Sequence, residues 1–437
     1  MSPFEIGGGA VMLLVALILI GMPIGIGMLA VSVGAVALLR NETVAIRMMT
    51  QVANDSLEEY LFAVVPLFVL MGLLVTVSGV GKDTFDVFQK LLKRVTAGLG
   101  VATVFANAVF AAITGISIAS ATVFSRIAVP EMRRHGYTNR FATGVVAGSS
   151  VLGMLIPPSL LMIVYAVLAE QSVGRMFLAG VGPGLVLALA FTLTIWILAT
   201  TRKSFVFERT DDATGYDDIR GRDVLRKSIP ILALVTVVLG GLYGGFLNPT
   251  EAGAAGAFGA LVIALMRRSL DRVTFWRILV ETGLITVSVL FLILAATFFS
   301  RMLALTGVPR ELAEFFLSDR IGPYGFLCVF ILLIIALGCL IDSISIMLIV
   351  LPIALPVADA AGFDLIWFGV ITVIATEIGL LTPPFGLSVY TIKSAMDDPT
   401  LRVGEIFRGA VPFILAMLAT LAVIILFPSI ATWLARI

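Results

Sequence analysis

Long stretches of apolar residues, separated by short polar connections, dominate the chain. The clearest stretches cover residues 11–39, 61–80, 229–246, 279–299, 326–341 and 410–428. Each is near the roughly 20 residues that an α-helix needs to cross the hydrocarbon core of a bilayer. Strands of a membrane β-barrel would instead alternate apolar and polar residues. The pattern therefore predicts an all-α polytopic membrane protein, with residues 40–60 and 301–320 as polar connections.

Two apolar regions are divided near their middle, which predicts re-entrant helical hairpins. The first covers 97–130 and is divided by GISIAS at 115–120. The second covers 323–358 and is divided by CLIDSIS at 339–345. With a rise of about 1.5 Å per residue, neither half of the first region comfortably spans a bilayer. We therefore expect each region to enter and leave the membrane on one side.

Two further regions, 141–168 and 364–392, each contain a Pro-Pro pair. Proline removes a backbone donor and clashes with the preceding turn, so Pro157, Pro158, Pro383 and Pro384 predict broken helices. Carbonyls freed by such breaks are tolerated in a membrane only where they are buried in protein or line a cavity. GMPIG at 21–25 interrupts the first apolar stretch and is compatible with one kinked helix or with two helices.

The distribution of basic residues orients the chain. Four basic loops are found at 82–94, 132–140, 202–227 and 267–277. If 97–130 re-enters, an even number of crossings separates each loop from the next, so that all four lie on one side. An excess of Lys and Arg marks the cytoplasm. Residues 301–320 are then outside, and the second hairpin enters from the face opposite to the first.

The chain also carries an internal repeat at an offset of 226 residues. The matching pairs are Ser117 and Ser343, Ile127 and Ile353, Pro130 and Pro356, Gly136 and Gly362, and Leu155-x-Pro157-Pro158 and Leu381-x-Pro383-Pro384. Because the two copies enter from opposite faces, the repeat is inverted. Inverted repeats with broken helices at corresponding positions point to secondary transporters that bind near the midplane.

Polar residues at the breaks are the candidate binding positions. They are Gly115, Ser117 and Ser120 at the first tip, Ser149 and Ser150 before the first Pro-Pro pair, Asp342, Ser343 and Ser345 at the second tip, and Thr376, Glu377 and Thr382 near the second pair. Their oxygens suit a hard cation or a polar substrate. The alternative for the small hydroxyl residues is packing between helices.

The two carboxylates have distinct alternatives. Asp342 lies in an otherwise apolar run, where carboxylates are costly and usually functional, but it could instead cap the helix that starts at Ser343. Glu377 is a candidate coupling group, substrate contact or partner of a buried basic residue. The four prolines shape the site and are not expected to be ligands.

Composition excludes several functions. The chain is 59% hydrophobic and 13% charged, with a net charge of +1. It therefore lacks the excess of positive charge that a nucleic-acid-binding protein needs. Its one histidine, His135, lies in a basic loop without a paired nucleophile, and common metal and nucleophile motifs are absent. We therefore expect neither an enzyme nor a cofactor. A channel is disfavoured because no repeated filter sequence is found.

Three stretches carry a resemblance to a known family. They are RIAVPEMRRHGYTNRFATGVVAGSSVLGMLIPPSLLMIVYAVLAEQSVGRMFLAGVGPGL (126–185), PIALPVADAAGFDLIWFGVI and EIGLLTPPFGLSVY (within 352–390), and VPLFVLMGLLVTVSG (65–79). The chain resembles the large permease subunit of tripartite ATP-independent periplasmic (TRAP) transporters over nearly its whole length. It departs from the family at the first tip, where Ile118 and Ala119 replace further Gly and Ser.

This resemblance implies an importer in the bacterial inner membrane. Its partners would be a small four-helix membrane subunit and a soluble periplasmic binding protein, and its substrate an organic acid such as a dicarboxylate or sialic acid. The driving ion would typically be sodium, for which Asp342, Ser343 and Ser117 are the candidate ligands. A stand-alone sodium/carboxylate carrier without a binding protein is the alternative.

The family's elevator mechanism implies a division of the chain into scaffold and transport parts. Residues 1–96 would be N-terminal scaffold helices, and 97–200 the first repeat of the transport domain, with hairpin 97–130 and broken helix 141–168. Residues 201–322 would hold the cytoplasmic loop and central scaffold helices. The second repeat, 323–437, would contain hairpin 323–358, broken helix 364–392 and the last helix.

Overall fold

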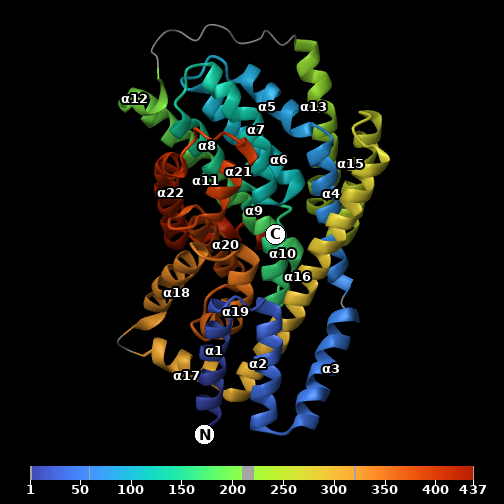
Figure 1. Ribbon diagram of the computed structural model, residues 1–437, viewed down its shortest axis with the longest axis vertical. Helices are drawn as coiled ribbons and strands as arrows, with labels where there is room; N and C mark the ends of the chain where they lie inside the picture. The colour runs from blue at the N-terminus through green and yellow to red at the C-terminus, as the bar shows by residue number, and fades with distance from the viewer. Residues whose placement is uncertain (1, 59, 209–220, 319–320, 437) are drawn as a thin grey trace.

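Helices make up the regular secondary structure of the computed structural model, which describes residues 2–58, 60–208, 221–318 and 321–436. Among these residues, the one extended contact is an isolated bridge between Tyr137 and Phe207. Six described helices are long and apolar enough to cross a membrane, or up to eight if each of two bent pairs is one span. The predicted all-α polytopic fold is confirmed, and Figure 1 shows an elongated bundle.

Both predicted hairpins are present. The first consists of α6 (Gly98–Thr114) and α7 (Ser117–Arg134), with Gly115 and Ile116 at its tip. Gly115 has a φ of +65°, a left-handed conformation that ends α6 and that residues with a Cβ rarely adopt. The second hairpin pairs α18 (Gly322–Gly338) with α19 (Ser343–Ala360) around a turn at residues 339–342.

Both Pro-Pro pairs interrupt helices at matching places, as predicted. In the first repeat, α8 (Asn139–Ser150) leads into the short α9 (Leu152–Leu155), and α10 (Leu160–Leu168) follows after the break with a bend of 43°. In the second, α20 (Leu365–Leu381) ends before the break and α21 (Leu387–Met396) follows. Both Pro–Pro peptide bonds are cis. The hydroxyl of Ser159 accepts a hydrogen bond from Met162 N and so caps α10.

GMPIG separates two helices and does not merely bend one. The helices α1 (Pro3–Leu19) and α2 (Ile24–Leu39) pack against each other, with Gly21 in the turn at a φ of +96°. The other long helices are α4 (Val64–Val77), α11 (Val173–Thr201), α13 (Gly221–Val235) with its continuation through η2 (Thr236–Gly240) and α14 (Gly241–Tyr243), α15 (Pro249–Met266), α16 (Arg272–Thr306) and α22 (Val403–Leu426). Short turns are η1 (Tyr60–Ala63), α12 (Lys203–Val206), α23 (Ser429–Thr432) and η3 (Leu434–Arg436).

Three segments predicted as polar connections or loops are helical, so that part of the prediction is wrong. They contain α3 (Glu42–Glu58), α5 (Val80–Leu91), and the end of α16 followed by α17 (Val308–Phe316). In α5 the buried residues Val80, Thr84 and Val87 form one stripe, so charged residues on the other face interrupt the apolar run without ending the helix. Of the predicted loop 202–227, residues 209–220 lie outside the described residues, and 221–227 belong to α13.

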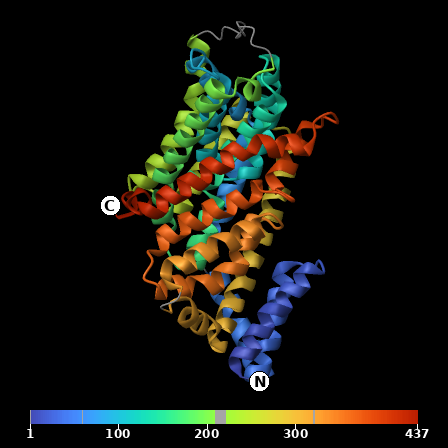
Figure 2. The same cartoon turned by 90° about the vertical axis from the view of Figure 1, so that its left-hand side faces the viewer.

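The four basic segments lie together at one end of the molecule. Lys227 pairs with Asp83 and Asp86, and Arg267 pairs with Asp83. Nearby, Arg140 donates to Ser204 O. The N-terminus and α17 lie at the opposite end (Figure 1, Figure 2). This arrangement agrees with the orientation inferred from charge, which makes the basic end cytoplasmic.

The two repeats interlock through their hairpins. In the first repeat α7 packs beside α21 of the second, and α19 of the second packs beside α10 of the first. Between α7 and α21, Arg126 Nε donates to Ala395 O at 3.2 Å, and Arg133 pairs with Asp398 at 2.8 Å. Hydrogen bonds from Thr400 and Arg133 hold the pKa of the Asp398 carboxyl well below its usual range, so this ion pair persists at mildly acidic pH.

Repeat-equivalent glycines allow each hairpin to approach its own broken helix. Gly153 lies against Ile116 and Ser117 of the first tip. Its counterpart 226 residues later, Gly379, lies against Gly338 at the end of α18. Cβ atoms at either contact would meet backbone that cannot move aside easily, so small residues set how closely the helices pack.

Replacing Gly379 with alanine tests this close approach. The added Cβ would lie 2.6 Å from Gly338 Cα and 2.9 Å from Ile335 O, forcing α18 and α20 apart. We expect Gly379→Ala to destabilise the protein by roughly 1–3 kcal/mol, as overpacking does. Thermal unfolding in detergent measures the loss. Gly283→Ala in α16 is the control, because no atom of the described residues lies within 4 Å of its Cβ position. Equal unfolding temperatures for the two variants would contradict the packing described here.

Candidate functional site

The two hairpins meet at Glu377, in a helix that forms the centre of the fold. Every residue of α20 from Ile366 to Leu381 is buried, and Glu377 is 0% exposed. Ser343, the first residue of α19, donates to Glu377 Oε1 at 3.2 Å. Ser117, the first residue of α7, lies beside the same carboxylate but outside hydrogen-bond geometry. The structure thus brings together three residues that the sequence placed on three separate segments.

The carboxylate of Glu377 lacks an ionic partner. No Lys, Arg or His side chain of the described residues pairs with it, and its Oε2 has no hydrogen bond. The predicted alternative of a buried pair with a basic residue is therefore wrong for the part of the chain that the structure describes. An ionised carboxylate in such a place is costly unless a charge compensates it.

The local geometry offers partial compensation from helix ends. Both α7 and α19 begin at this point, and helix N-termini carry partial positive charge and free N–H groups. The arrangement therefore combines oxygen ligands for a cation with donors for an anion. Such a combination is what a site for an ion and a carboxylate substrate requires.

At the second tip, Asp342 has the geometry of a helix cap. Its side chain accepts hydrogen bonds from Ser345 N at 3.1 Å and from Ser345 Oγ at 2.5 Å. Both carboxylate oxygens of Asp342 thus accept hydrogen bonds from Ser345, which was also predicted from the sequence as a candidate binding residue. Of the two roles considered for Asp342, the structure shows the cap, and its role as a sodium ligand stays a prediction.

Four other candidate hydroxyls donate to carbonyls of their own helices. Ser149 donates to Val145 O, Ser150 to Ala147 O, Thr376 to Thr372 O and Thr382 to Ile378 O, at 2.7 to 2.9 Å. Each hydroxyl oxygen keeps a lone pair with which it can accept a hydrogen bond or bind a cation. Ser120 is fully buried and its hydroxyl has no partner among the described residues.

The tip of the first hairpin packs against the first Pro-Pro break and is hydrogen-bonded to it. Gly115 O accepts from Leu160 N at 3.2 Å, and a Cβ at Gly115 would lie 2.5 Å from Pro158 O. Gly115 belongs to the first repeat, as Ser149 and Ser150 do. No hydrogen bond among the described residues joins these three residues to Glu377. The candidates therefore form two groups, with Ser117 next to the second.

One buried residue was missed by the sequence prediction. Asn107 in α6 is fully buried and donates from Nδ2 to Ser149 Oγ at 2.6 Å, while its Oδ1 has no partner in the described part of the chain. A lone amide in the apolar stretch VFANAVFAA was the available signal. Asn107 lies within α6 and away from the helix breaks, where the sequence placed the candidate residues.

Comparison with known proteins identifies the family. Residues 11–430 match the family model described as tripartite ATP-independent periplasmic transporter, DctM component. The chain belongs to this TRAP transporter family. It is therefore a multi-pass protein of the inner membrane, in agreement with its apolar helices.

Relatives of this TRAP permease are named for different compounds. It is 32% identical to the C4-dicarboxylate TRAP transporter large permease protein DctM of Pseudomonas aeruginosa, with 91% of each chain covered. It is 29% identical to the sialic acid large permease protein SiaM of Vibrio cholerae, with 94% of each covered. It is 30% identical to the ectoine/5-hydroxyectoine large permease protein UehC of Ruegeria pomeroyi, with 96% of each covered. Membership of the family therefore does not identify the compound that this protein transports.

A solved structure supports the fold of the TRAP permease. The crystal structure of the Alcanivorax borkumensis YdaH transporter, described as having an unusual topology, matches with a TM-score of 0.56. The two chains are 14% identical, and the match covers 85% of this chain and 86% of YdaH. At that identity the likeness concerns architecture alone.

Two substitutions at Asp342 separate the cap from a ligand role. Asp342→Ala should lose about 1 kcal/mol of stability, whereas Asp342→Asn should unfold near the wild-type temperature because asparagine also caps helices. Sodium affinity is then measured on the stable Asn variant by sodium-dependent uptake. The sequence prediction is weaker sodium dependence, and an unchanged affinity would leave Asp342 as a cap only.

Proposed function

We propose that this chain is the large permease subunit of a sodium-driven importer of an organic acid. A periplasmic binding protein delivers the substrate, and a separate small four-helix membrane subunit completes the complex. The observation that carries the proposal is the meeting of both hairpins at the unpaired, buried Glu377.

The proposed coupling ion binds at Glu377. Sodium prefers oxygen ligands. Glu377 Oε2 and the hydroxyl of Ser117 are buried oxygens that form no hydrogen bond with any residue in the described part of the chain. A bound cation would compensate the carboxylate and hold Ser117 and Ser343 close to it. Sodium therefore orders the two tips, although they belong to hairpins that enter from opposite faces.

We propose that an anionic substrate binds after the cation. Its carboxylate is placed against the N–H groups at the starts of α7 and α19, where the helix dipoles favour negative charge. Because ion and substrate then share the same two tips, each raises the affinity for the other by the same factor. This reciprocity is the basis of symport. The names of the relatives favour a dicarboxylate or a sialic-acid-like carboxylate.

Two equivalent clefts support an elevator movement. One, of about 410 Å³, lies between α5 and α7 at the basic end and includes Pro130. The other, of about 440 Å³, lies between α16, α19 and the end of α10, and includes Pro356, the repeat counterpart of Pro130. Each cleft lies between a hairpin and a helix of the proposed scaffold, where the proposed movement of the hairpin-bearing transport domain would take place.

Glu377→Gln tests the cation site. The amide keeps the size of the side chain and can accept from Ser343, but it removes the negative charge. We expect the sodium concentration for half-maximal uptake to rise about tenfold or more, a loss of about 1.4 kcal/mol. Uptake measured across a sodium series gives this value.

Glu314→Gln is the control for that experiment. Glu314 is an exposed carboxylate on α17 that pairs with Arg310, so its loss should leave sodium dependence unchanged. Wild-type sodium dependence in Glu377→Gln would overturn the proposed cation site.

Uptake into proteoliposomes tests the whole proposal. The chain is reconstituted with its small subunit and offered a pool of organic acids, with and without an inward sodium gradient and the cognate binding protein. We expect accumulation, read by mass spectrometry, only when both are present. Uptake with sodium but without the binding protein would instead establish a stand-alone carrier, and uptake without sodium would reject sodium coupling.

A further inference from the structure

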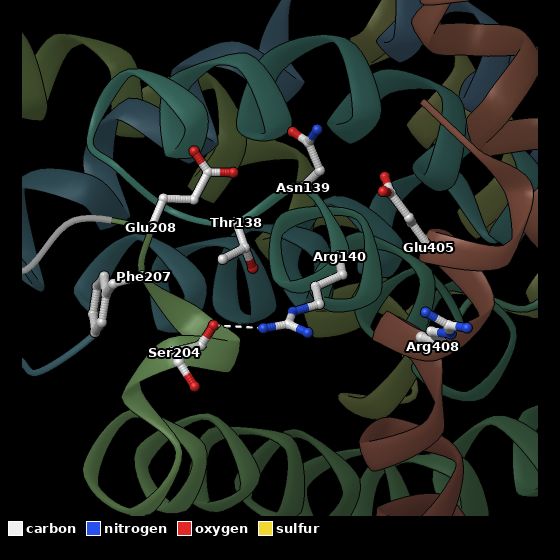
Figure 3. A pocket seen from close by; sticks show the side chains of 8 residues that line it. All are labelled: Thr138, Asn139, Arg140, Ser204, Phe207, Glu208, Glu405 and Arg408. Carbon is white, nitrogen blue, oxygen red and sulfur yellow. Dashed lines mark hydrogen bonds between the residues drawn. The ribbon is translucent and has the colours of Figure 1, made fainter. Parts of the chain in front are cut away.

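A charged pocket that includes none of the candidate site residues lies at the basic end of the molecule. It has a volume of about 460 Å³ and is formed by the first turn of α8, the segment around α12 and the first turns of α22. Figure 3 shows Glu405 and Arg408 on α22 and Arg140 on α8, with Ser204 and Glu208 on the other side. Nothing in the proposed transport cycle uses this pocket.

The pocket contains charges of both signs, and most of them are unpaired. Arg140 is held in place, because it donates to Ser204 O at 2.5 Å and lies 4.7 Å over the ring of Phe205. Arg408, Glu405 and Glu208 form no ion pair with any residue that the structure describes. Two guanidinium groups and two carboxylates therefore face one space without neutralising one another.

Apolar surface leads away from the pocket along two helices. On α22, Val411 and Leu415 follow Arg408 at helical spacing and are 48% and 60% exposed. On α11, which ends just before α12, Leu193 and Trp196 are 55% and 51% exposed. The two helices pack together, with Phe191 against Phe413.

Both α11 and α22 are long and apolar enough to cross a membrane, so we infer that this surface faces lipid. In the orientation inferred from charge, the pocket lies at its cytoplasmic edge. Exposed apolar residues on membrane-spanning helices contact acyl chains, and a tryptophan near a helix end marks the level of the headgroups. The charged groups of the pocket are therefore at the depth of phospholipid headgroups. Their arrangement at the end of two apolar faces matches a molecule with a polar head and two tails.

We propose that this pocket binds the headgroup of phosphatidylethanolamine. Arg408 and Arg140 bind the phosphate, because a planar guanidinium can donate two parallel hydrogen bonds to phosphate oxygens. Glu405 and Glu208 accept hydrogen bonds from the primary ammonium, and the acyl chains lie along α11 and α22. This proposal does not depend on the cargo or on the coupling ion.

Both signs of charge are needed to select this headgroup. Phosphatidylglycerol has a phosphate but no cation for the two glutamates, which would then stay uncompensated beside an anion. Phosphatidylcholine has a cation, but its quaternary nitrogen cannot donate hydrogen bonds to carboxylates. The pocket should therefore discriminate among three lipids that share the same tails.

Native mass spectrometry of the purified full chain tests the proposal. Dissociation constants are measured for the dioleoyl forms of phosphatidylethanolamine, phosphatidylglycerol and phosphatidylcholine. We expect phosphatidylethanolamine to bind about tenfold more tightly than the other two. Arg408→Gln should weaken its binding about tenfold. Glu405→Gln should remove most of the preference over phosphatidylglycerol.

Arg402→Gln is the matched control, because Arg402 is an exposed arginine at the start of α22 that does not line the pocket. It should bind all three lipids as the wild type does. The unfolding temperature of each variant shows that a change in lipid binding is not a loss of fold. Equal affinities for the three lipids, wild-type binding by Arg408→Gln, or equal losses in Arg408→Gln and Arg402→Gln would each overturn the proposal.

Discussion

A carboxylate placed where water cannot reach it must be compensated by its surroundings, and in this protein those surroundings are the starts of two helices. Glu377 is buried in the central helix α20, with Ser343 bonded to it and Ser117 beside it. Helices that begin inside a membrane exist only because the chain is broken there. The breaks and the hairpins consequently serve the same end, because they bring the starts of two helices to a buried carboxylate that they partly satisfy.

The inverted repeat explains how two helix ends reach the same point. Hairpins that enter from opposite faces reach their tips near the midplane, and the glycine pair Gly153 and Gly379 lets each hairpin approach its own broken helix. The contacts of α7 with α21 and of α19 with α10 then join each hairpin to the other repeat. Neither repeat would be complete alone, so movement of the hairpins is expected to be concerted.

The sequence predicted those parts of the fold that local chemistry determines. The Pro-Pro pairs and the polar hairpin tips were visible as interruptions of apolar runs, although single prolines such as Pro130 and Pro356 lie inside continuous helices. The amphipathic helices α3, α5 and α17 were missed because a helix that buries one face has no continuous apolar run. The convergence at Glu377 joins segments that are far apart in the chain, and it could not be predicted from spacing. The cap formed by Asp342 was one of two alternatives that the residue type left open.

Hydrogen–deuterium exchange at the two tips tests the central claim most directly. Peptides covering residues 115–120 and 339–345 are compared in sodium and in choline, in the wild type and in Glu377→Gln. If a cation at Glu377 joins the hairpins, sodium slows exchange at both tips together in the wild type and at neither in the variant. Protection of a single tip, or equal protection by sodium in the variant, would contradict the account.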